Sequence, residues 1–582
     1  MRAILTTSIG IYCTVAVLTA EGGDILRGGT SVGARPGAPR KATMSPAQEL
    51  ATANAREALA RTSKSIKAVQ QMQAAARNFA LHGTSNLRVN NAPLPNVPNG
   101  LKIGGLQVAP GVPQNLAQPT EGENPGLWIG ALLPKETVSG DQTKVSIKQT
   151  EPQAVLNWQT FNVGKETTVV FNQKAGTAKD GSNNWIAFNK INDPSGVPSQ
   201  ILGSIKAYGA VYLINQNGIV FGGSSQVNLH SFVASSLHIN DDLIGRLLNN
   251  PTGEFLFSAS RVADPSFRLD GATSYVLGDS LVPGSTPTVT VASGSGATTL
   301  NGTTDFALTL DGSGKPMLEF TDVGLAKIGG GEVSVSYFNQ QGGDIVVQPG
   351  ARLTAPATAA NVGGRISLIG PNVRNGGTIS TPDGQTILAA GLQVGFASHP
   401  TDDPSLRGLD TFIGAEGSKT GTASNSGLID APRTSVLMAG KNVDQRGAIA
   451  STTSVSLNGR IDLLAEYDSV SSGGLANFAP FFPQTTGTVT FGANSVTQVV
   501  PELDNPETVV GTKLALESQV NARGRAIHFA KDATLLAPGA DVTLSAGNWK
   551  LTGLDIKAPI HNFIYTSGQI YLDSGANINV AG

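Results

Sequence analysis

From about residue 126 to the C-terminus, apolar and polar residues alternate in short runs that are separated by glycine, asparagine and aspartate. The clearest example is the segment 201–222, ILGSIKAYGAVYLINQNGIVFG, in which Gly203, Gly209 and the corner 215–218 interrupt closely spaced apolar residues. Asparagine and glycine tolerate the positive φ angles of tight turns, and alternating runs of four or five residues are typical of strands. The pattern therefore predicts many short strands joined by tight turns.

Internal similarity predicts that these strands stack as repeated coils. The segments that begin at Val347, Phe529 and Leu572 share one template: an apolar residue, a turn, alanine, a polar residue and a further apolar residue. Such self-similarity is the sequence signature of a solenoid, because a coil of short strands buries its apolar face only against its neighbours. Stacking at about 4.8 Å would build a continuous core of aliphatic ladders. We expect residues 339–582 to continue this solenoid.

One segment breaks the coil pattern. Residues 259–338 contain longer alternating runs joined by Gly-Ser and Asn-Gly turns, most clearly over residues 286–322. Such runs favour antiparallel hairpins. We therefore predict a β insertion outside the coils, which is either a binding surface or a loop decoration without function.

The N-terminal region has a third pattern. Residues 1–20 combine one basic residue with an almost uncharged apolar stretch and small residues, which predicts a signal peptide. Residues 21–125 predict a spacer. Within it, residues 45–81 have an N-capping serine, an early proline and one narrow apolar stripe, which favour an amphipathic helix, and a proline-rich linker follows. Two interpretations of the helix stay open: a membrane-surface or partner-docking helix, and a solvated pro-region helix.

Composition narrows the class of protein. The 582 residues include 70 glycines, with 14% charged and 5% aromatic residues, which suits short strands and tight turns better than a helical bundle. The hydrophobic fraction of 40% is too high for general disorder. The net charge of −2 argues against recruitment to nucleic acid or anionic lipid by bulk electrostatics. The only cysteine, Cys13, lies in the predicted signal peptide, so we expect no disulfide in the mature chain.

The segment 201–222 resembles the secretion domain of filamentous-haemagglutinin-type exoproteins, the passengers of two-partner secretion. The family pattern is an apolar strand, Asn-Pro-Asn-Gly-Ile and then Phe-Gly; this chain has Gln216 in place of the proline and matches the other positions. The motifs around it follow the family order. They are NWQTFNVGKETTVVFNQ (157–173), AFNKI (187–191), VNLHSFVASSL (227–237), GEFLFS (253–258) and GGRISLIGPNVRNGGTISTPDGQTILAAG (363–391).

The resemblance implies an all-β fold: a right-handed parallel β-helix with a β-hairpin insertion and an N-terminal helical and linker extension. It also implies that residues 126–258 form a two-partner secretion domain, which an outer-membrane β-barrel transporter recognises. The protein would then be a secreted or surface-exposed adhesin of a bacterium with an outer membrane, with a possible ligand on host or neighbouring cells. The secretion-motif candidates are Asn157, Trp158, Phe161, Asn162, Asn215, Asn217, Gly218 and Ile219.

Two interpretations of these candidates stay open. They contact the transporter directly, or they are structural, with asparagines in the corners and aromatic rings capping the first coil.

Two other functions also stay open: a β-helical polysaccharide-active enzyme, and the delivery stem of a contact-dependent toxin. An enzyme of this fold would use carboxylates on one exposed face. The carboxylates of the coil region are irregularly spaced, and we expect surface turn roles for them. They are Glu332, Asp344, Asp383, Asp410 and Asp462.

No catalytic residue, cofactor or metal site is expected from the sequence. The six histidines are scattered, and His230 and His238 do not have the spacing of a zinc site. The pairs Asp241–Asp242 and Asp402–Asp403 and the turn at Asp311 lack the pattern of a calcium-binding loop. We therefore expect an exoprotein that is not an enzyme.

Overall fold

The computed structural model describes residues 97–179, 181, 183–241, 253–293, 296–358, 363–399, 403, 405–417, 420–472, 480–502, 516–553 and 560–581. The predicted signal peptide and the predicted helix at 45–81 lie outside these residues. Within the described ranges, no helix has the length and apolar character needed to cross a membrane.

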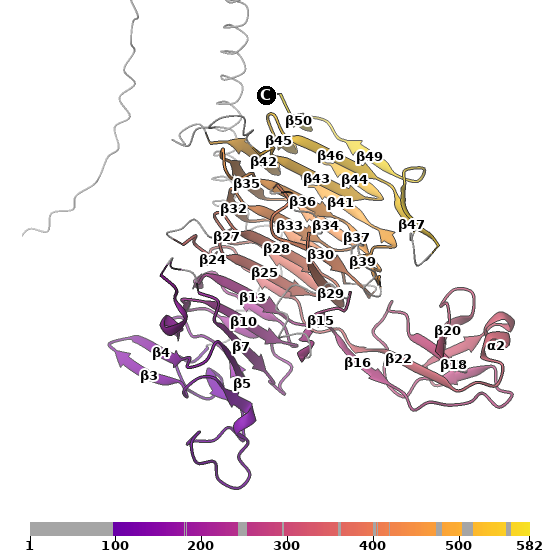
Figure 1. Ribbon diagram of the computed structural model, residues 1–582, viewed down its shortest axis with the longest axis horizontal. Helices are drawn as coiled ribbons and strands as arrows, with labels where there is room; N and C mark the ends of the chain where they lie inside the picture. Colours follow the sequence, from indigo (N-terminus) through magenta and orange to yellow (C-terminus); the bar gives the residue numbers. More distant parts are fainter. Residues whose placement is uncertain are drawn as a thin grey trace, which may run out of the picture. The chain divides into compact units, whose positions relative to one another are not determined.

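Most strands belong to three long sheets (Figure 1). Sheet 1 contains, in spatial order, β1 (Leu106–Val108), β5 (Gln153–Phe161) with β2 (Trp128–Ile129) beside it, β7 (Ile186–Ile191), β10 (Ala210–Asn215), β13 (Ser231–Ser235), β25 (Arg365–Gly370), β28 (Gln385–Ala390), β33 (Ser435–Ala439), β36 (Arg460–Leu464), β43 (Gln519–Gly524) and β46 (Asp541–Ala546). Sheet 2 contains β8 (Ser199–Ile201), β11 (Ile219–Phe221), β23 (Ile345–Val347), β26 (Asn372–Asn375), β31 (Thr422–Asn425), β34 (Asn442–Gln445), β41 (Thr488–Phe491), β44 (Ala526–Phe529) and β49 (Gln569–Leu572). Sheet 3 contains β3 (Lys135–Ser139), β4 (Gln142–Lys148), β6 (Thr167–Asn172), β9 (Ser204–Ala207), β12 (Gln226–Asn228), β24 (Arg352–Thr354), β27 (Thr378–Ser380), β32 (Leu428–Pro432), β35 (Ala448–Thr453), β42 (Val496–Pro501), β45 (Thr534–Leu536) and β50 (Asn577–Asn579).

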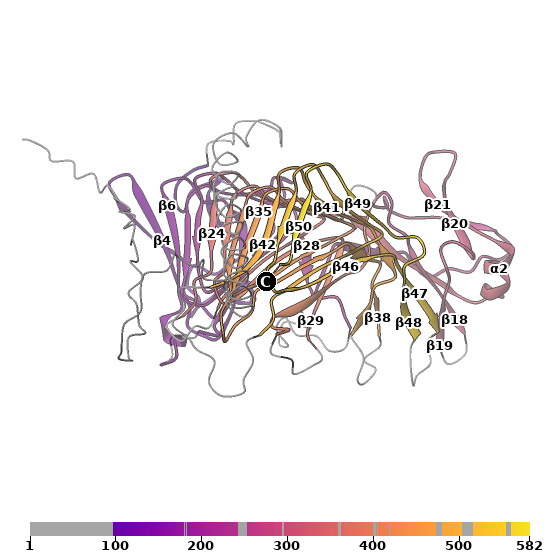
Figure 2. The same ribbon diagram turned by 90° about the horizontal axis from the view of Figure 1, so that it is seen from above.

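The chain passes repeatedly from sheet 3 to sheet 1 to sheet 2, as in the coil β9–β10–β11. Strands of successive coils pair parallel and in register; Leu213 of β10, for example, lies between Asn189 and Ala234. Figure 2 looks along the stack, so the coils lie over one another. This is a parallel β-helix, and the prediction of that fold is confirmed. The shared template marks the passage from sheet 2 to sheet 3, because Val347, Phe529 and Leu572 end strands β23, β44 and β49.

One continuous apolar core fills the inside of the coils. It consists of ladders of identical or similar side chains, such as Leu368, Leu388, Met438 and Leu463 of sheet 1, which are all fully buried. Because strands in register place equivalent side chains directly above one another, the alternating sequence pattern becomes a continuous apolar stack.

A second, smaller core lies on the outer face of sheet 1. A four-stranded antiparallel sheet packs there, formed by β14 (His238–Ile239), β15 (Phe257–Ser258), β29 (Gln393–Ser398) and β30 (Leu409–Ile413). It buries outward-facing side chains of sheet 1 such as Phe188 and Tyr212. Three two-stranded pairs decorate later coils: β37 (Glu466–Tyr467) with β40 (Thr485–Thr486), β38 (Val470–Ser471) with β39 (Phe481–Phe482), and β47 (Asn548–Gly553) with β48 (Ile560–Ile564).

The chain leaves the coils between β15 and β23 and forms antiparallel sheets there (Figure 1). One sheet contains β16 (Ser260–Ala263), β22 (Val333–Gln340), β18 (Thr288–Ser293) and β19 (Gly296–Thr299). The other contains β17 (Ser274–Val276), β21 (Pro316–Phe320) and β20 (Phe306–Leu310). A short helix, α2 (Asp322–Ile328), is capped by Thr321, whose hydroxyl accepts from the Gly324 amide at 3.2 Å. The insertion has its own apolar core around Leu318 and Tyr337.

Candidate secretion site in the first coils

Asn215 builds the corner between β10 and β11. Its side chain is 1% exposed, and Oδ1 accepts a hydrogen bond from the Asn217 amide at 3.0 Å. Its carbonyl accepts from the Gly218 amide at 2.9 Å. Nδ2 donates to Ser199 Oγ of β8, at 2.9 Å. An asparagine that bonds the backbone two residues ahead stabilises a tight turn, so Asn215 closes this corner and fastens it to the preceding coil.

Gly218 is required by the backbone at this corner. Its φ of 98° lies in the region that favours glycine, and a Cβ at this position would come within 2.7 Å of the Asp344 carbonyl oxygen. Asp344 belongs to the next coil, whose Gly343 amide donates to the Gln216 carbonyl at 2.7 Å. The corners of successive coils therefore stack backbone against backbone.

The other corner candidates are also held within the domain. Asn217 is half-buried, and its Nδ2 donates to the Asp193 carbonyl at 2.7 Å. Ile219 is fully buried in the core and lies between Ser199 and Ile345 of the neighbouring coils. Gln216, which replaces the proline of the family pattern, contacts His238 through its side chain.

The aromatic candidates of β5 lie inside the first coil. Trp158 is fully buried, and its indole N–H donates to Asn189 Oδ1 at 3.0 Å. The rings of Trp128 and Phe161 each pack edge-on against it, at 5.1 Å between centroids. Phe161 is 1% exposed. In the folded protein these two side chains are therefore inaccessible to a partner.

Asn157 of β5 and Asn162, which directly follows β5, fasten the chain segment 97–131 onto the first coil. Asn157 Nδ2 donates to the Leu127 carbonyl at 2.9 Å, and its own carbonyl accepts from the Ala109 amide at 3.0 Å. Asn162 Nδ2 donates to the Gly104 carbonyl at 3.1 Å, and its Oδ1 accepts from the Gln200 amide at 2.8 Å. Both side chains therefore bond main-chain groups, which cost free energy when they are buried without a partner.

Residues 97–125 differ from the extended linker that the sequence favours. β1 pairs antiparallel with β5, and Leu106 and Val112 are buried in the coil core. The prolines remove amide donors, but the apolar residues between them gain more by covering the open end of the first coil than by staying in water. The short apolar run Leu106–Val108 was the available signal for this cap.

A network of buried amides in the first coils was also missed from the sequence. Gln149, Gln173 and Asn183 are at most 3% exposed. Gln173 Nε2 donates to Gln149 Oε1 at 2.9 Å, and Asn183 Nδ2 donates to the Gln173 carbonyl at 2.8 Å. Both glutamines follow a sheet 3 strand with the same pattern, an apolar residue, a polar residue and glutamine, and this repetition could have identified them.

Apart from Asp410 and Asp462, which lie close enough to interact, the carboxylates considered for an enzyme do not gather at one site in the described residues. Glu332 is exposed on the insertion. Asp344 pairs with Arg374 at 3.4 Å, and Asp462 with Arg460 at 2.7 Å. Burial raises the pKa of Asp410, and the neighbouring Asp462 carboxylate raises it further. Across the described ranges, no group of three or more His, Cys, Asp or Glu side chains could hold a metal ion.

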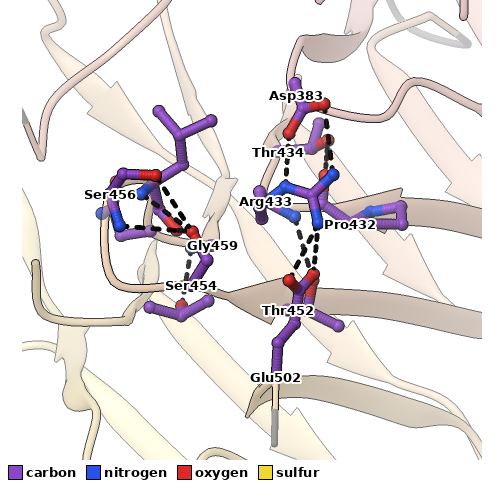
Figure 3. Close-up of polar contacts among 12 residues, drawn as sticks. Asp383, Pro432, Arg433, Thr434, Thr452, Ser454, Ser456, Gly459 and Glu502 are labelled. Carbon is purple, nitrogen blue, oxygen red and sulfur yellow. Dashed lines mark hydrogen bonds and ion pairs between the residues drawn. The ribbon is translucent and has the colours of Figure 1, made fainter. Parts of the chain in front are cut away.

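Asp383 belongs to an ion cluster that joins several coils (Figure 3). Arg433 Nε donates to Asp383 Oδ1 at 2.5 Å, and Arg433 Nη1 donates to both Glu502 oxygens, at 2.7 and 2.9 Å. Hydrogen bonds to Asp383 and Glu502 raise the pKa of Arg433. Thr452 Oγ1 donates to Glu502 Oε1 at 2.6 Å. Arg433 thus bridges two carboxylates from different coils, as in a structural clamp.

The fold is a β-helix with a cap on its first coil, and Asn215 closes the corner between β10 and β11. These features define a β-solenoid protein. Within that class, residues 131–263 match the model of the TPS secretion domain family. The chain therefore carries a TPS secretion domain, and the resemblance to two-partner secretion passengers is confirmed.

The chain also has similar relatives among known proteins. It is 31% identical over 93 residues to a heme/hemopexin-binding protein of Haemophilus influenzae, covering 16% of this chain and 9% of that protein. It is 29% identical over 105 residues to the heme/hemopexin-binding protein of another H. influenzae strain, covering 18% and 11%. The matches thus span only about a tenth of these relatives. Among solved structures, the HMW1 secretion domain from H. influenzae is similar with a TM-score of 0.43 and 17% identity, over 78% of this chain and 83% of that one.

Proposed function

We propose that this chain is a secreted or surface-exposed exoprotein of the adhesin type. An outer-membrane transporter of the two-partner type exports it, and its first coils are both the secretion signal and the folding nucleus. The match of residues 131–263 to the TPS secretion domain carries this proposal. Specificity for the transporter lies in the strand and corner motifs of these coils.

The burial of the candidate residues determines when they act. Trp158, Phe161 and Asn215 are at most 1% exposed in the folded domain. A transporter therefore binds these side chains only while the chain is unfolded, when they and the strand edges are accessible. An unfolded strand can add to a partner's sheet through main-chain hydrogen bonds, and side-chain pockets then supply specificity.

Folding outside the membrane then favours onward movement of the chain. The cap formed by residues 97–131 closes one end of the first coil, and the Asn215 corner fastens the coil β9–β10–β11 to the coil before it. Each further coil pairs with a preformed neighbour, so it orders only its own short loop. The free energy of coil growth is released on the outer side, and the export step needs no nucleotide.

The test is export of a corner variant from cells that also produce the transporter. We expect the double variant Asn215→Ala/Asn217→Ala to lose secretion into the medium, while the signal-cleaved chain accumulates in the periplasm. Immunoblots of medium and periplasm measure the distribution, and mass spectrometry of the N-terminus measures cleavage.

The matched control is Asn425→Ala. Asn425 is also a fully buried, hydrogen-bonded asparagine of the β-helix, but it lies outside residues 131–263. We expect this variant to reach the medium. Normal secretion of the corner variant would refute the proposed signal. Equal loss of both variants would show that secretion reports general stability of the β-helix instead.

A further inference from the structure

The outer face of sheet 3 has an unusual composition over its first strands, β3, β4, β6, β9, β12 and β24. Side chains alternate between the core and the surface along a strand, and Val145, Val169 and Ile205 mark the inward positions. The outward positions on these strands are basic, serine, threonine, asparagine or glutamine, with one exception, Val170. None of them is a carboxylate. The basic residues are Lys135, Lys144, Lys148, Lys206 and Arg352.

These five residues, which we call the cationic face, are exposed. No ion pair within the described ranges involves any of them. Several basic residues elsewhere are paired, for example Arg433 with Asp383, Lys327 with Asp305 at 2.7 Å, and Lys441 with Glu416. The chain as a whole has a net charge of −2. The outward positions of this face carry unpaired cations and no carboxylate, so they create a local positive potential that favours an anionic partner.

A groove of about 390 Å³ lies on this face, beside the β3–β4 hairpin. Lys144 and Lys206 line it, together with the hydroxyl groups of Thr137, Ser139 and Thr168. Glu166 lies at the margin, where one of its oxygens accepts from Gln142 Nε2 at 2.5 Å. The groove thus offers cations together with many small hydrogen-bonding groups.

The cations recur regularly along the stack of coils. Lys144 is on β4, Lys206 on β9 and Arg352 on β24, and one strand lies between each pair, β6 and β12 respectively. Because neighbouring strands lie about 4.8 Å apart, successive cations are separated by about 9.6 Å along the stack. Lys144 and Arg352 lie in one column of the register, and Lys206 lies two residues to the side of it, so the three cations form a zigzag along the stack. A linear polysaccharide that carries one negative charge on every second sugar ring has its charges at about the same spacing along its length.

We propose that the cationic face binds a linear acidic polysaccharide laid along the coils, with its anionic groups on Lys144, Lys206 and Arg352. The hydroxyl and amide side chains between the cations donate to and accept from sugar hydroxyl groups. Outward positions on these strands include no aromatic residue for stacking nucleic-acid bases and almost no apolar surface for acyl chains. This adds a binding activity of the folded protein to its proposed export.

The experiment measures binding of the purified, folded full chain, so its result is independent of export. The probe is hyaluronan, which carries one carboxylate per disaccharide; dextran is the neutral control, and phosphatidylglycerol vesicles are the anionic-lipid control. We expect binding to hyaluronan alone, weakening as salt rises from about 50 to 200 mM. The triple variant Lys144→Gln/Lys206→Gln/Arg352→Gln should bind about tenfold more weakly, because each exposed ionic contact contributes a small amount.

The matched variant is Lys102→Gln/Lys315→Gln/Lys531→Gln, which removes the same charge from exposed positions off this face. It should retain wild-type affinity within about twofold, because surface charges separated by more than a Debye length are screened. Equal weakening of both triple variants would overturn the proposal, since net charge alone would then explain binding. Equal binding of dextran, preference for the vesicles, or no binding to hyaluronan would also overturn it.

Discussion

In the first coils, the corner that leads from sheet 3 into sheet 1 holds Gln149, Gln173 and Asn183. In the middle coils, the same corner is occupied by Asp383 and Arg433, with Glu502 two coils beyond Arg433. The first set is neutral and at most 3% exposed. The second is charged, and the Arg433 side chain is 26% exposed. One corner of one fold is thus stabilised by two different chemistries.

The difference follows from what each environment permits. A neutral amide can be fully buried when its donors and acceptors are all bonded. Charged groups lose much hydration on burial, so a charged corner keeps contact with water and pairs each ion. Asp383 and Arg433 also have φ values of 59° and 53°, which cost a non-glycine residue about 1 kcal/mol each. The ion pair between Asp383 and Arg433 offsets this backbone cost. The clamp also joins coils that are far apart in the sequence.

The largest expected effect comes from breaking the neutral corner. In Gln173→Leu, the Gly209 amide and Gln149 Oε1 lose the hydrogen-bond partners they have at 2.8 and 2.9 Å. Both groups are buried, and each unpaired buried group costs about 1–3 kcal/mol, so we expect a loss of about 2–5 kcal/mol in unfolding free energy. Urea unfolding of the full chain measures it.

The control for this variant is Gln226→Leu, at an exposed position on β12. A change at such a site should alter stability by no more than about 0.5 kcal/mol. Because the corner is neutral, the loss in Gln173→Leu should be the same in low and high salt. A loss no larger than that of the control would mean that the amide network contributes nothing.

Breaking the charged corner should have a smaller effect. In Arg433→Met, the Asp383 carboxylate, whose side chain is 3% exposed, loses its partner. Complete burial of an unpaired charge would cost more, but partial exposure of the site reduces the penalty, and we expect about 1–3 kcal/mol. About 1 M salt should reduce this loss, because it screens the partly exposed pair with Glu502.

Arg374→Met is the matched variant for the charged corner. Arg374 pairs with Asp344 at 3.4 Å, with side chains 43% and 31% exposed. Such an exposed pair contributes at most about 1 kcal/mol, so this variant should lie well below Arg433→Met. If the two variants lose equal stability, or if the Arg433→Met loss is independent of salt, the clamp is not an electrostatic device.

The sequence predicted those features whose signal is local. Alternation and turn residues predict strands and corners. The template at Val347, Phe529 and Leu572 predicts stacking, because each coil is one continuous stretch of chain and its pattern therefore repeats along the sequence. The motif around Asn215 identified a corner for the same reason. The Arg433 clamp could not be predicted, because its partners lie 50 and 69 residues away and become neighbours only after the coils stack.

The cap on the first coil escaped prediction for a related reason. The apolar residues of 97–131 are sparse among prolines, and their value depends on an open coil end that only the folded structure provides. Asn157 and Asn162 were identified as candidates, but their bonds to Leu127 and Gly104 are long-range contacts. Sequence reasoning located these residues and left their partners undetermined.

The smallest effect concerns one outward column of sheet 3, which presents Lys206 in the first coils and Asp430 in the middle coils. Lys206 is exposed, whereas Asp430 is half-buried, and burial raises its pKa although Ser380 Oγ donates to it at 3.3 Å. A carboxyl with a raised pKa keeps its proton longer in the folded state. Stability is therefore lost as pH rises from the unfolded value of about 3.9 through the folded pKa.

Asp430→Asn removes this titration and keeps an oxygen that can accept from Ser380. We expect the variant to have a slightly higher urea midpoint than wild type at neutral pH, and the difference should disappear below about pH 4, where both side chains are neutral. Lys206→Gln, in the same column, should leave the pH dependence in this range unchanged, because it keeps the Asp430 carboxyl group in place. A lower midpoint for Asp430→Asn at neutral pH would mean that the ionised carboxylate stabilises the middle coils, and the column would then carry favourable charge in both regions.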